Sequence, residues 1–138
     1  MISSASSPLI LGITGASGLI YAVHALKHLL AADYAVEVVA SKSTYLVWQA
    51  EQGVRMPVEA ERQAEFWRQQ AGGVTGGKLR CHPWGDVGAN IASGSFKAAG
   101  MLVMPCSMST AAKLANGLSS ALLERAADVQ HKEGRRLV

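Results

Sequence analysis

The sequence predicts an α/β fold in which a parallel β-sheet carries helices on both faces. Three observations lead to this prediction. Short apolar strands alternate with helical segments, the first strand ends in a Gly-rich turn that opens a helix, and neither an internal repeat nor a linker interrupts the chain. With 138 residues, of which 49% are hydrophobic, the chain has the size and apolar content of one domain, residues 1–138, with its own core.

The elements of the first half follow from apolar runs and helical periods. A continuously apolar run that ends in glycine is typical of a strand buried on both faces, and apolar residues at helical spacing follow it. A polar helix further along is expected to face solvent. The expected ranges are strand 8–14, helix 17–32, strand 36–40, helix 44–51, helix 59–70 and strand 78–82.

The second half continues the alternation. The expected ranges are a short helix 86–91, strand 100–104, helices 109–115 and 120–130, and the start of a fifth strand at 135–138, with Gly134 as the preceding helix stop. A sheet of this kind normally continues, so we expect a fragment that lacks its last strand or strands and a C-terminal helix.

Composition excludes several classes of protein. The net charge is +3 and no basic block is interleaved with aromatic residues, which argues against nucleic-acid binding. The charged fraction of 17% is low and indicates surface buried against other subunits. No apolar run approaches the roughly 20 residues of a membrane span and no signal peptide is recognisable, so we expect a cytoplasmic protein. His24 and His28 lie four residues apart without an evident third ligand, so no metal site is predicted.

The turn Gly12-Ile13-Thr14-Gly15-Ala16-Ser17-Gly18 is the strongest local signal. Backbone N–H groups and the positive end of the following helix together attract a phosphate; the alternative is a tight turn without a ligand. The spacing is similar to the Thr-Gly-x-x-Gly turn of extended short-chain dehydrogenases. That alternative is disfavoured because Ser41-Lys42-Ser43 occupies the ribose-reading place and no Tyr-x-x-x-Lys pair is present.

Two further clusters carry polar chemistry. Met104-Pro105-Cys106-Ser107-Met108-Ser109-Thr110 follows the fourth strand, at the edge where open α/β sheets bind ligands; an ordinary helix cap is the alternative. Arg125 and Lys132 are seven residues apart and share a helix face, so they could converge on a phosphate. From spacing alone, however, a solvated amphipathic helix explains this pair better.

Taken in order, these motifs resemble those of the UbiX-type flavin prenyltransferases. The resemblance rests on the Gly-rich turn, Ser41-Lys42, Glu51, Ala92-Ser93-Gly94-Ser95, Pro105-Cys106-Ser107, and the stretch from Glu124 to Glu133. It implies a Rossmann-like (flavodoxin-like) three-layer sandwich and a metal-free transfer of a dimethylallyl group from dimethylallyl phosphate to N5 and C6 of reduced FMN. The prenylated FMN would serve a UbiD-type decarboxylase, in ubiquinone synthesis or on aromatic acids, and the enzyme would be a homo-oligomer, typically a dodecamer.

The resemblance also assigns expected roles to individual residues. It places Gly15, Ala16 and Ser17 at the FMN phosphate region, with Ser41 nearby, and Ser107, Met108, Ser109 and Thr110 against the flavin. Glu51, Arg125 and Lys132 match catalytic residues around the substrate phosphate and the reacting centre. Ala92 and Val87 match positions beside the dimethylallyl group, Val87 standing where some members have tryptophan.

The family pattern also departs from this chain and leaves alternatives open. Its Arg-Glu-x-Pro segment and a later Tyr and Arg are absent here, so we expect weak FMN binding and poor turnover. A flavin-dependent cysteine decarboxylase of the same fold is disfavoured, because such enzymes carry a histidine shortly before the fourth strand, whereas Ser93-Gly94-Ser95 stands there. A non-catalytic FMN-binding fragment remains a further alternative.

Overall fold

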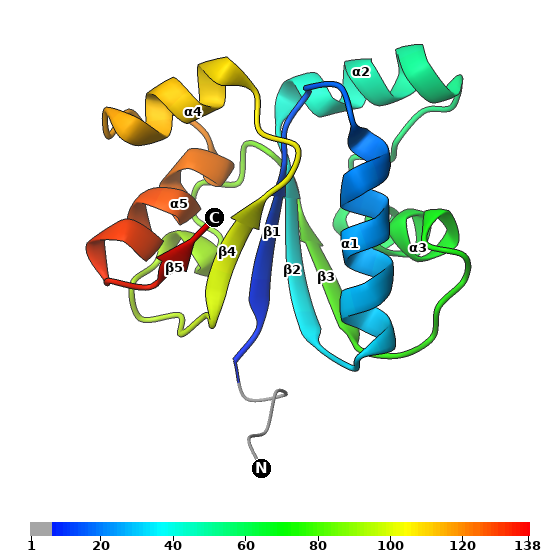
Figure 1. Cartoon of the computed structure of the whole chain (residues 1–138), viewed down its shortest axis with the longest axis horizontal. Coiled ribbons are helices and arrows are strands. Elements are labelled where there is room, and N and C mark those ends of the chain that lie inside the picture. Colours follow the sequence, from blue (N-terminus) through cyan, green and yellow to red (C-terminus); the bar gives the residue numbers. More distant parts are fainter. Residues whose placement is uncertain (1–6) are drawn as a thin grey trace.

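The computed structural model describes residues 7–138 and contains a five-stranded sheet with helices on both faces (Figure 1). The elements in chain order are β1 (Leu9–Ile13), α1 (Leu19–Ala31), β2 (Ala35–Ala40), α2 (Lys42–Gln52), α3 (Ala60–Gln70), β3 (Lys78–His82), the 3₁₀ helix η2 (Asn90–Ala92), β4 (Gly100–Val103), α4 (Met108–Ala115), α5 (Leu122–Lys132) and β5 (Arg136–Leu137). The predicted α/β alternation is confirmed.

All paired strands are parallel, in the order β3-β2-β1-β4-β5. The chain moves outward from β1 to β3 and then returns to the other side of β1 with β4. The strand order therefore reverses between β1 and β4, and the crevice beyond the carboxyl ends of these two strands is where such sheets bind ligands. This topology places the Gly-rich turn and the segment after β4 next to each other.

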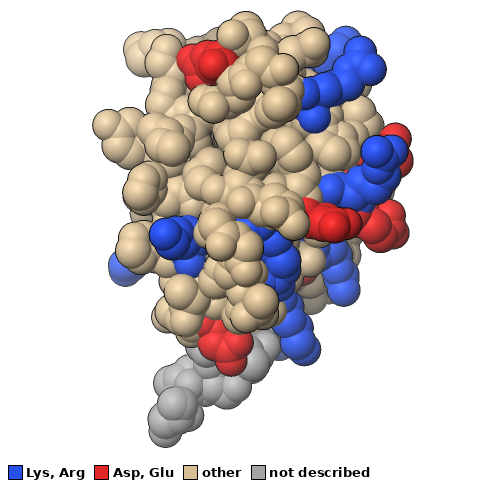
Figure 2. Space-filling view, turned by 90° about the vertical axis from the view of Figure 1, so that its right-hand side faces the viewer, with Lys and Arg blue, Asp and Glu red and all other residues tan. Residues whose placement is uncertain are grey.

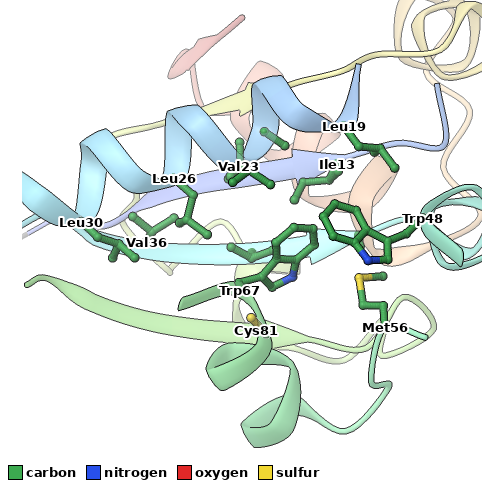
Figure 3. Close-up of a cluster of buried hydrophobic side chains, with 14 residues drawn as sticks. Ile13, Leu19, Val23, Leu26, Leu30, Val36, Trp48, Met56, Trp67 and Cys81 are labelled. Atoms are coloured by element: carbon green, nitrogen blue, oxygen red, sulfur yellow. The ribbon is translucent and has the colours of Figure 1, made fainter. Parts of the chain in front are cut away.

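Alternate residues of each strand enter two different cores, one on each face of the sheet. On one face, Leu11, Val38 and Cys81 pack beneath α1, α2 and α3, whose Leu26, Trp48 and Trp67 fill the space (Figure 3). On the other face, strand residues pack against α5 and the loop before β4; this core contains Ile10, Val39, Ile91, Ala98, Met101, Val103, Leu122, Leu123, Ala126 and Ala127. Burial on both faces explains why the strands lack polar alternation.

Helix α3 exposes much of its polar surface to solvent, as its composition predicts, but it also has a buried face that includes a polar residue. Gln63 and Trp67 are fully buried. The Trp67 indole N–H donates to Gln63 Oε1 at 3.3 Å, and Gln63 Nε2 donates to the Tyr45 hydroxyl at 2.9 Å and to the Pro57 carbonyl at 3.0 Å. Because these bonds satisfy the amide group, a polar residue can serve as the inward face of the helix.

The helix expected at 86–91 is also wrong in extent and type. Residues 86–89 form turns, and only the single 3₁₀ turn η2 follows them. Ile91 is fully buried in the second core, so tertiary packing holds this segment. The glycines at 85 and 88 lower the propensity for a regular α-helix in this stretch.

The Trp67→Ala substitution tests the packing of α3. The Trp67 ring meets Trp48 and Phe66 edge-to-face, with ring centroids 5.3 and 5.4 Å apart. Truncation leaves a cavity in the first core, and we expect the free energy of unfolding to fall by about 3–5 kcal/mol. Urea unfolding measures this loss. The control Arg62→Ala, on an exposed position of the same helix, should change it by less than about 0.5 kcal/mol; equal effects would contradict the packing assigned to α3.

Candidate functional site

The buried hydroxyl of Thr14 joins the two turns at the carboxyl edge of the sheet. Thr14 Oγ1 donates to the Pro105 carbonyl at 2.7 Å and accepts from the Ser107 N–H at 2.9 Å. The Thr14 N–H reaches the same Pro105 carbonyl at 3.2 Å. One side chain, 1% exposed, therefore positions the turn after β1 against the turn after β4.

The end of β2 is attached to the first turn in a similar way. Ser41 N and Thr44 Oγ1 both donate to the Ile13 carbonyl, at 2.8 and 2.6 Å. The Ser41 hydroxyl lies 2.9 Å from the Thr44 hydroxyl. The start of α2 therefore lies directly beside the Gly-rich turn, with Ser41 half-buried at the junction.

Glycine is required at position 15 because α2 comes so close. A Cβ atom built on Gly15 would lie 2.5 Å from Ser43 Oγ and 2.9 Å from a Ser43 backbone carbon. Gly18 begins α1 with a φ of 96°, a left-handed conformation that glycine adopts without strain. No side chain caps α1. The Tyr21 N–H donates to the Gly18 carbonyl at 2.9 Å, and the N–H groups of Leu19 and Ile20 before it are left for another acceptor, as an anion-binding helix N-terminus needs.

The turn after β4 uses part of its hydroxyl cluster internally. Ser107 caps α4 by accepting from the Thr110 N–H at 3.1 Å, and its hydroxyl donates to Thr110 Oγ1 at 2.9 Å. Met108 and Ser109 are exposed beside this cap. The Cys106 thiol is also exposed, and desolvation of its sulfur raises its pKa, which disfavours the nucleophilic thiolate.

Glu51 does not join the other expected catalytic residues within one chain. It is exposed near the end of α2, about 15 Å along the helix from Ser41 at about 1.5 Å per residue. In Figure 1, α2 extends to one side of the sheet while α5, which carries Arg125 and Lys132, lies on the other. No contact in one chain therefore brings the Glu51 carboxylate to these cations.

Arg125 and Lys132 share the exposed side of α5, as their spacing predicts. They stand about 10 Å apart along the helix axis, and Lys132 Nζ lies 3.7 Å from a carboxylate oxygen of Glu133. Helix α5 begins near the carboxyl edge, where the Leu122 N–H donates to the Trp84 carbonyl at 3.1 Å. It ends just before β5, so Lys132 lies toward the opposite edge of the sheet.

The two expected substrate-wall residues lie in the loop between β3 and β4. Ala92 is the last residue of η2 and packs against the second core, whereas Val87 is 42% exposed in the preceding turn. Ala92 therefore has a defined position beside α5, and Val87 presents its side chain to solvent.

A groove of about 630 Å³ lies beside α2 rather than over the Gly-rich turn. Its lining includes Lys42, Leu46, Arg55 and Trp84, and the Lys42 ammonium lies 5.1 Å from the centre of a Trp84 ring. Apart from Lys42, which belongs to the Ser41-Lys42 motif, the lining of the groove is separate from the residues that the motifs single out.

His82, at the end of β3, is engaged inside the fold. Its Nε2 lies 2.7 Å from Glu37 Oε1, and both side chains are about nine-tenths buried. Burial, together with the nearby Glu37 carboxylate, raises the pKa of Cys81 to about 12. Among residues 7–138, no three His, Cys, Asp or Glu side chains are placed to hold a metal ion. Within the same range, no helix is long and apolar enough to cross a bilayer.

Sequence reasoning missed two residues that organise the site. Thr14 was visible within the Gly-rich motif, but nothing local showed that its hydroxyl reaches residues 91 and 93 positions away. Thr44 stands in the first turn of α2, where its hydroxyl bond to Ile13 closes the junction with β1. The only signal in the sequence was a threonine close to the end of a strand. This pattern is too common to show which residue the hydroxyl contacts.

The Thr14→Val substitution tests the link between the turns. Valine keeps the shape but leaves the Ser107 N–H without its acceptor, so the free energy of unfolding should fall by about 1–3 kcal/mol. FMN, the expected ligand, should bind about tenfold more weakly, equivalent to about 1.4 kcal/mol. Urea unfolding and flavin-fluorescence titration measure the two effects. Thr75→Val, at an exposed loop position, is the matched control and should leave both unchanged.

The Gly15→Ala substitution tests the close approach of α2. The added methyl would meet a backbone atom of Ser43, so the turn must move and we expect FMN affinity to fall by at least about tenfold, or 1.4 kcal/mol. Gly85→Ala is the control, because a Cβ at Gly85 meets no heavy atom within 4 Å. Equal FMN dissociation constants for the two variants would show that the turn is not the phosphate site.

The chain is similar to known flavin enzymes in sequence. Residues 3–138 match the Flavoprotein family. The flavin prenyltransferase UbiX of Synechocystis sp. is 71% identical over 133 residues, which are 96% of this chain and 65% of that protein. The chain thus spans less than two thirds of this relative's length. The resemblance inferred from the motifs is confirmed.

Solved structures agree with the fold. The crystal structure of AnUbiX (PadA1) in complex with FMN and dimethylallyl pyrophosphate superposes with a TM-score of 0.76 at 30% identity, over 95% of this chain and 62% of that one. A dodecameric FMN-dependent UbiX-like decarboxylase from Escherichia coli O157:H7 gives a TM-score of 0.73 at 35% identity, over 94% and 63% of the two chains. Since the family match extends over residues 3–138 and the fold agrees, the chain belongs to the Flavoprotein family.

Proposed function

We propose that this chain is the FMN-binding part of a flavin prenyltransferase. The enzyme transfers a dimethylallyl group from dimethylallyl phosphate to N5 and C6 of reduced FMN. The prenylated FMN then serves a UbiD-type decarboxylase. The observation that carries the proposal is the meeting of the two turns at Thr14, at the point where strand order reverses, in a chain 71% identical to a UbiX flavin prenyltransferase.

We assign the FMN phosphate to the turn after β1, at the carboxyl edge of the sheet, because backbone N–H groups are free there. Gly15, Ala16 and Ser17 precede an uncapped helix, and Ser41 adds a hydroxyl from β2. The segment Ser107–Thr110 follows β4 on the other side of the reversal point and is assigned to the flavin ring. The exposed Met108 and Ser109 are free to make such contacts, while Ser107 and Thr110 hold the turn in shape.

The chemistry gives each remaining residue a separate task. Bound reduced FMN supplies the electron-rich ring that accepts the allyl group. Arg125 and Lys132 place positive charge where the bond between allylic carbon and phosphate oxygen breaks, because the phosphate leaves with the electron pair and cations stabilise it. Bond formation at N5 releases the N5 proton as phosphate leaves, and bond formation at C6 releases the C6 proton while the allyl double bond takes one up. Glu51 would act as the base that receives the C6 proton. Ala92 and Val87 line the dimethylallyl group.

The separation of Glu51 from Arg125 and Lys132 supports a homo-oligomeric enzyme. Since one chain keeps these groups on opposite sides of the sheet, we propose that neighbouring subunits contribute to a shared centre. Ile20 and Tyr21 at the start of α1, Leu46 within α2 and Met108 at the start of α4 are exposed large hydrophobic side chains. Figure 2, which views the side of the molecule that carries α1, shows mostly uncharged surface in its upper part between a few charged side chains, as suits a subunit interface. A dodecamer, as named for the Escherichia coli relative, is the proposed assembly.

The cysteine decarboxylase alternative finds less support. Residues 93–99, before β4, contain no histidine. The His82 side chain is buried against Glu37 and does not reach the open edge. The non-catalytic alternative predicts FMN binding without product. We propose residues 1–138 as one FMN-binding domain that acts in the cytoplasm.

The decisive experiment incubates the chain anaerobically with reduced FMN and dimethylallyl phosphate, then detects prenylated FMN by mass spectrometry. We expect product, and we expect Glu51→Gln to slow its formation by about 10²–10⁴-fold because the base is lost. Glu65→Gln, at an exposed position on α3, is the control. Bound FMN without product would favour the non-catalytic alternative. Product from Glu51→Gln at the unmodified rate would remove Glu51 from the mechanism.

A further inference from the structure

The loop before β4 is attached to the end of α5 by one side chain. Arg135 donates from Nη2 to the Gly94 carbonyl at 2.8 Å and from Nη1 to the Phe96 carbonyl at 2.9 Å. These partners lie 41 and 39 positions away in the sequence. A planar guanidinium presents its donors in a rigid fork, so both carbonyls are held in one orientation.

A second contact joins the same loop to Lys132. A Cβ atom on Gly94 would lie 2.8 Å from Glu133 Oε2. That same oxygen is 3.7 Å from Lys132 Nζ. The Glu133 carboxylate therefore touches the loop on one side and the Lys132 ammonium on the other, so a shift of the loop displaces both.

Hydrophobic packing alone does not hold the middle of this loop. Ile91 and Ala98 are buried in the second core and anchor its two ends. Ser93 and Ser95, between these anchors, are exposed. Their hydroxyls lie 2.8 Å apart, and the Ser93 hydroxyl also accepts from the Ser95 N–H at 3.3 Å, so these bonds stay within the segment. Phe96 is partly buried against the second core, and the two Arg135 bonds add to this packing by holding the Gly94 and Phe96 carbonyls beside the end of α5.

We infer that Arg135 is a positioning residue for the allyl phosphate, an inference that rests on the proposed function. It holds the loop that follows Ala92 at a set distance from Lys132, so that the apolar wall for the dimethylallyl group and the cation for its phosphate are presented together. In this role Arg135 acts through the loop and not on the substrate, since its Nη1 and Nη2 are directed at two backbone carbonyls. Its role is to keep the allyl-phosphate side of the centre assembled before substrate binds.

Ending helix α5 does not require the Arg135 side chain. The Arg135 backbone N–H donates to the Gln130 carbonyl at 2.8 Å, and Gly134 adopts a φ of 69°. Both features are backbone features that any residue at 135 would retain. Ending the helix therefore does not account for the two hydrogen bonds that the Arg135 side chain makes to the loop.

The Arg135→Lys variant tests the inference, because lysine keeps the charge but lacks the rigid planar fork that orients both carbonyls. In the FMN-loaded chain, we expect the dissociation constant for dimethylallyl phosphate, measured by calorimetry, to rise about tenfold, the effect of one charge-assisted hydrogen bond. The FMN dissociation constant should stay within about twofold, since the FMN turns lie elsewhere. Amide hydrogen exchange across residues 93–97 should become faster. Arg136→Lys, at the exposed neighbouring position, is the matched control.

The Gly94→Ala variant gives an independent test that keeps Arg135. Its methyl would lie 2.8 Å from Glu133 Oε2, so the flexible Glu133 side chain must move from its place beside Lys132. We therefore expect weaker dimethylallyl phosphate binding and unchanged FMN binding. The positioning role is overturned if Arg135→Lys behaves like Arg136→Lys, or if FMN and dimethylallyl phosphate affinities fall together. If the unaltered chain binds FMN but no dimethylallyl phosphate, the proposed function itself fails, and the two failures are thereby distinguished.

Discussion

The hydrogen bonds of the Thr14 hydroxyl are the constraint on which the carboxyl edge of the sheet depends. A hydroxyl can donate and accept at once, and Thr14 uses both capacities to connect the Pro105 carbonyl with the Ser107 N–H. These backbone groups lie beyond the ends of the strands, where the hydrogen bonds between neighbouring strands do not reach them. Through this link the start of α1 and the start of α4 acquire a common frame, and a ligand that spans them meets a preorganised surface.

The two turns joined by Thr14 stand at the edge of a sheet whose two faces are each covered by a hydrophobic core. Helix α5 can approach the sheet closely because Gly12 has no side chain, and a Cβ there would lie 3.0 Å from Met101 and 3.2 Å from Leu123. On the opposite face, the Trp48–Phe66–Trp67 cluster secures α2 and α3. Since both faces of the sheet are covered, the open carboxyl edge is where polar groups gather without a burial penalty.

The reactive groups are divided between two regions of this architecture. The turns around Thr14 offer N–H groups and hydroxyls, while Lys132, Glu133 and the loop tied by Arg135 form a second region at the end of α5. Glu51 belongs to neither, because α2 carries it away from the sheet. Because the reactive groups of one chain lie in separate regions, we propose a centre that neighbouring subunits share. In such a centre, contacts such as those of Arg135 keep each region in its own arrangement.

The amino-acid sequence determined the alternation of strands and helices, since apolar runs and helical periods are local properties. It also predicted the Gly-rich turn, because glycine permits the positive φ at Gly18 and the close approach of α2 at Gly15. The sequence did not predict the burial of Gln63, because a polar residue is expected to be exposed unless its hydrogen-bond partners, here Tyr45 and Pro57, are known. Only the tertiary structure decided that Thr14 joins two turns, that Arg135 holds a distant loop and that Glu51 stands apart from Lys132. Each of these depends on distances between residues far apart in the chain, and packing of the two cores, rather than any local pattern, sets such distances.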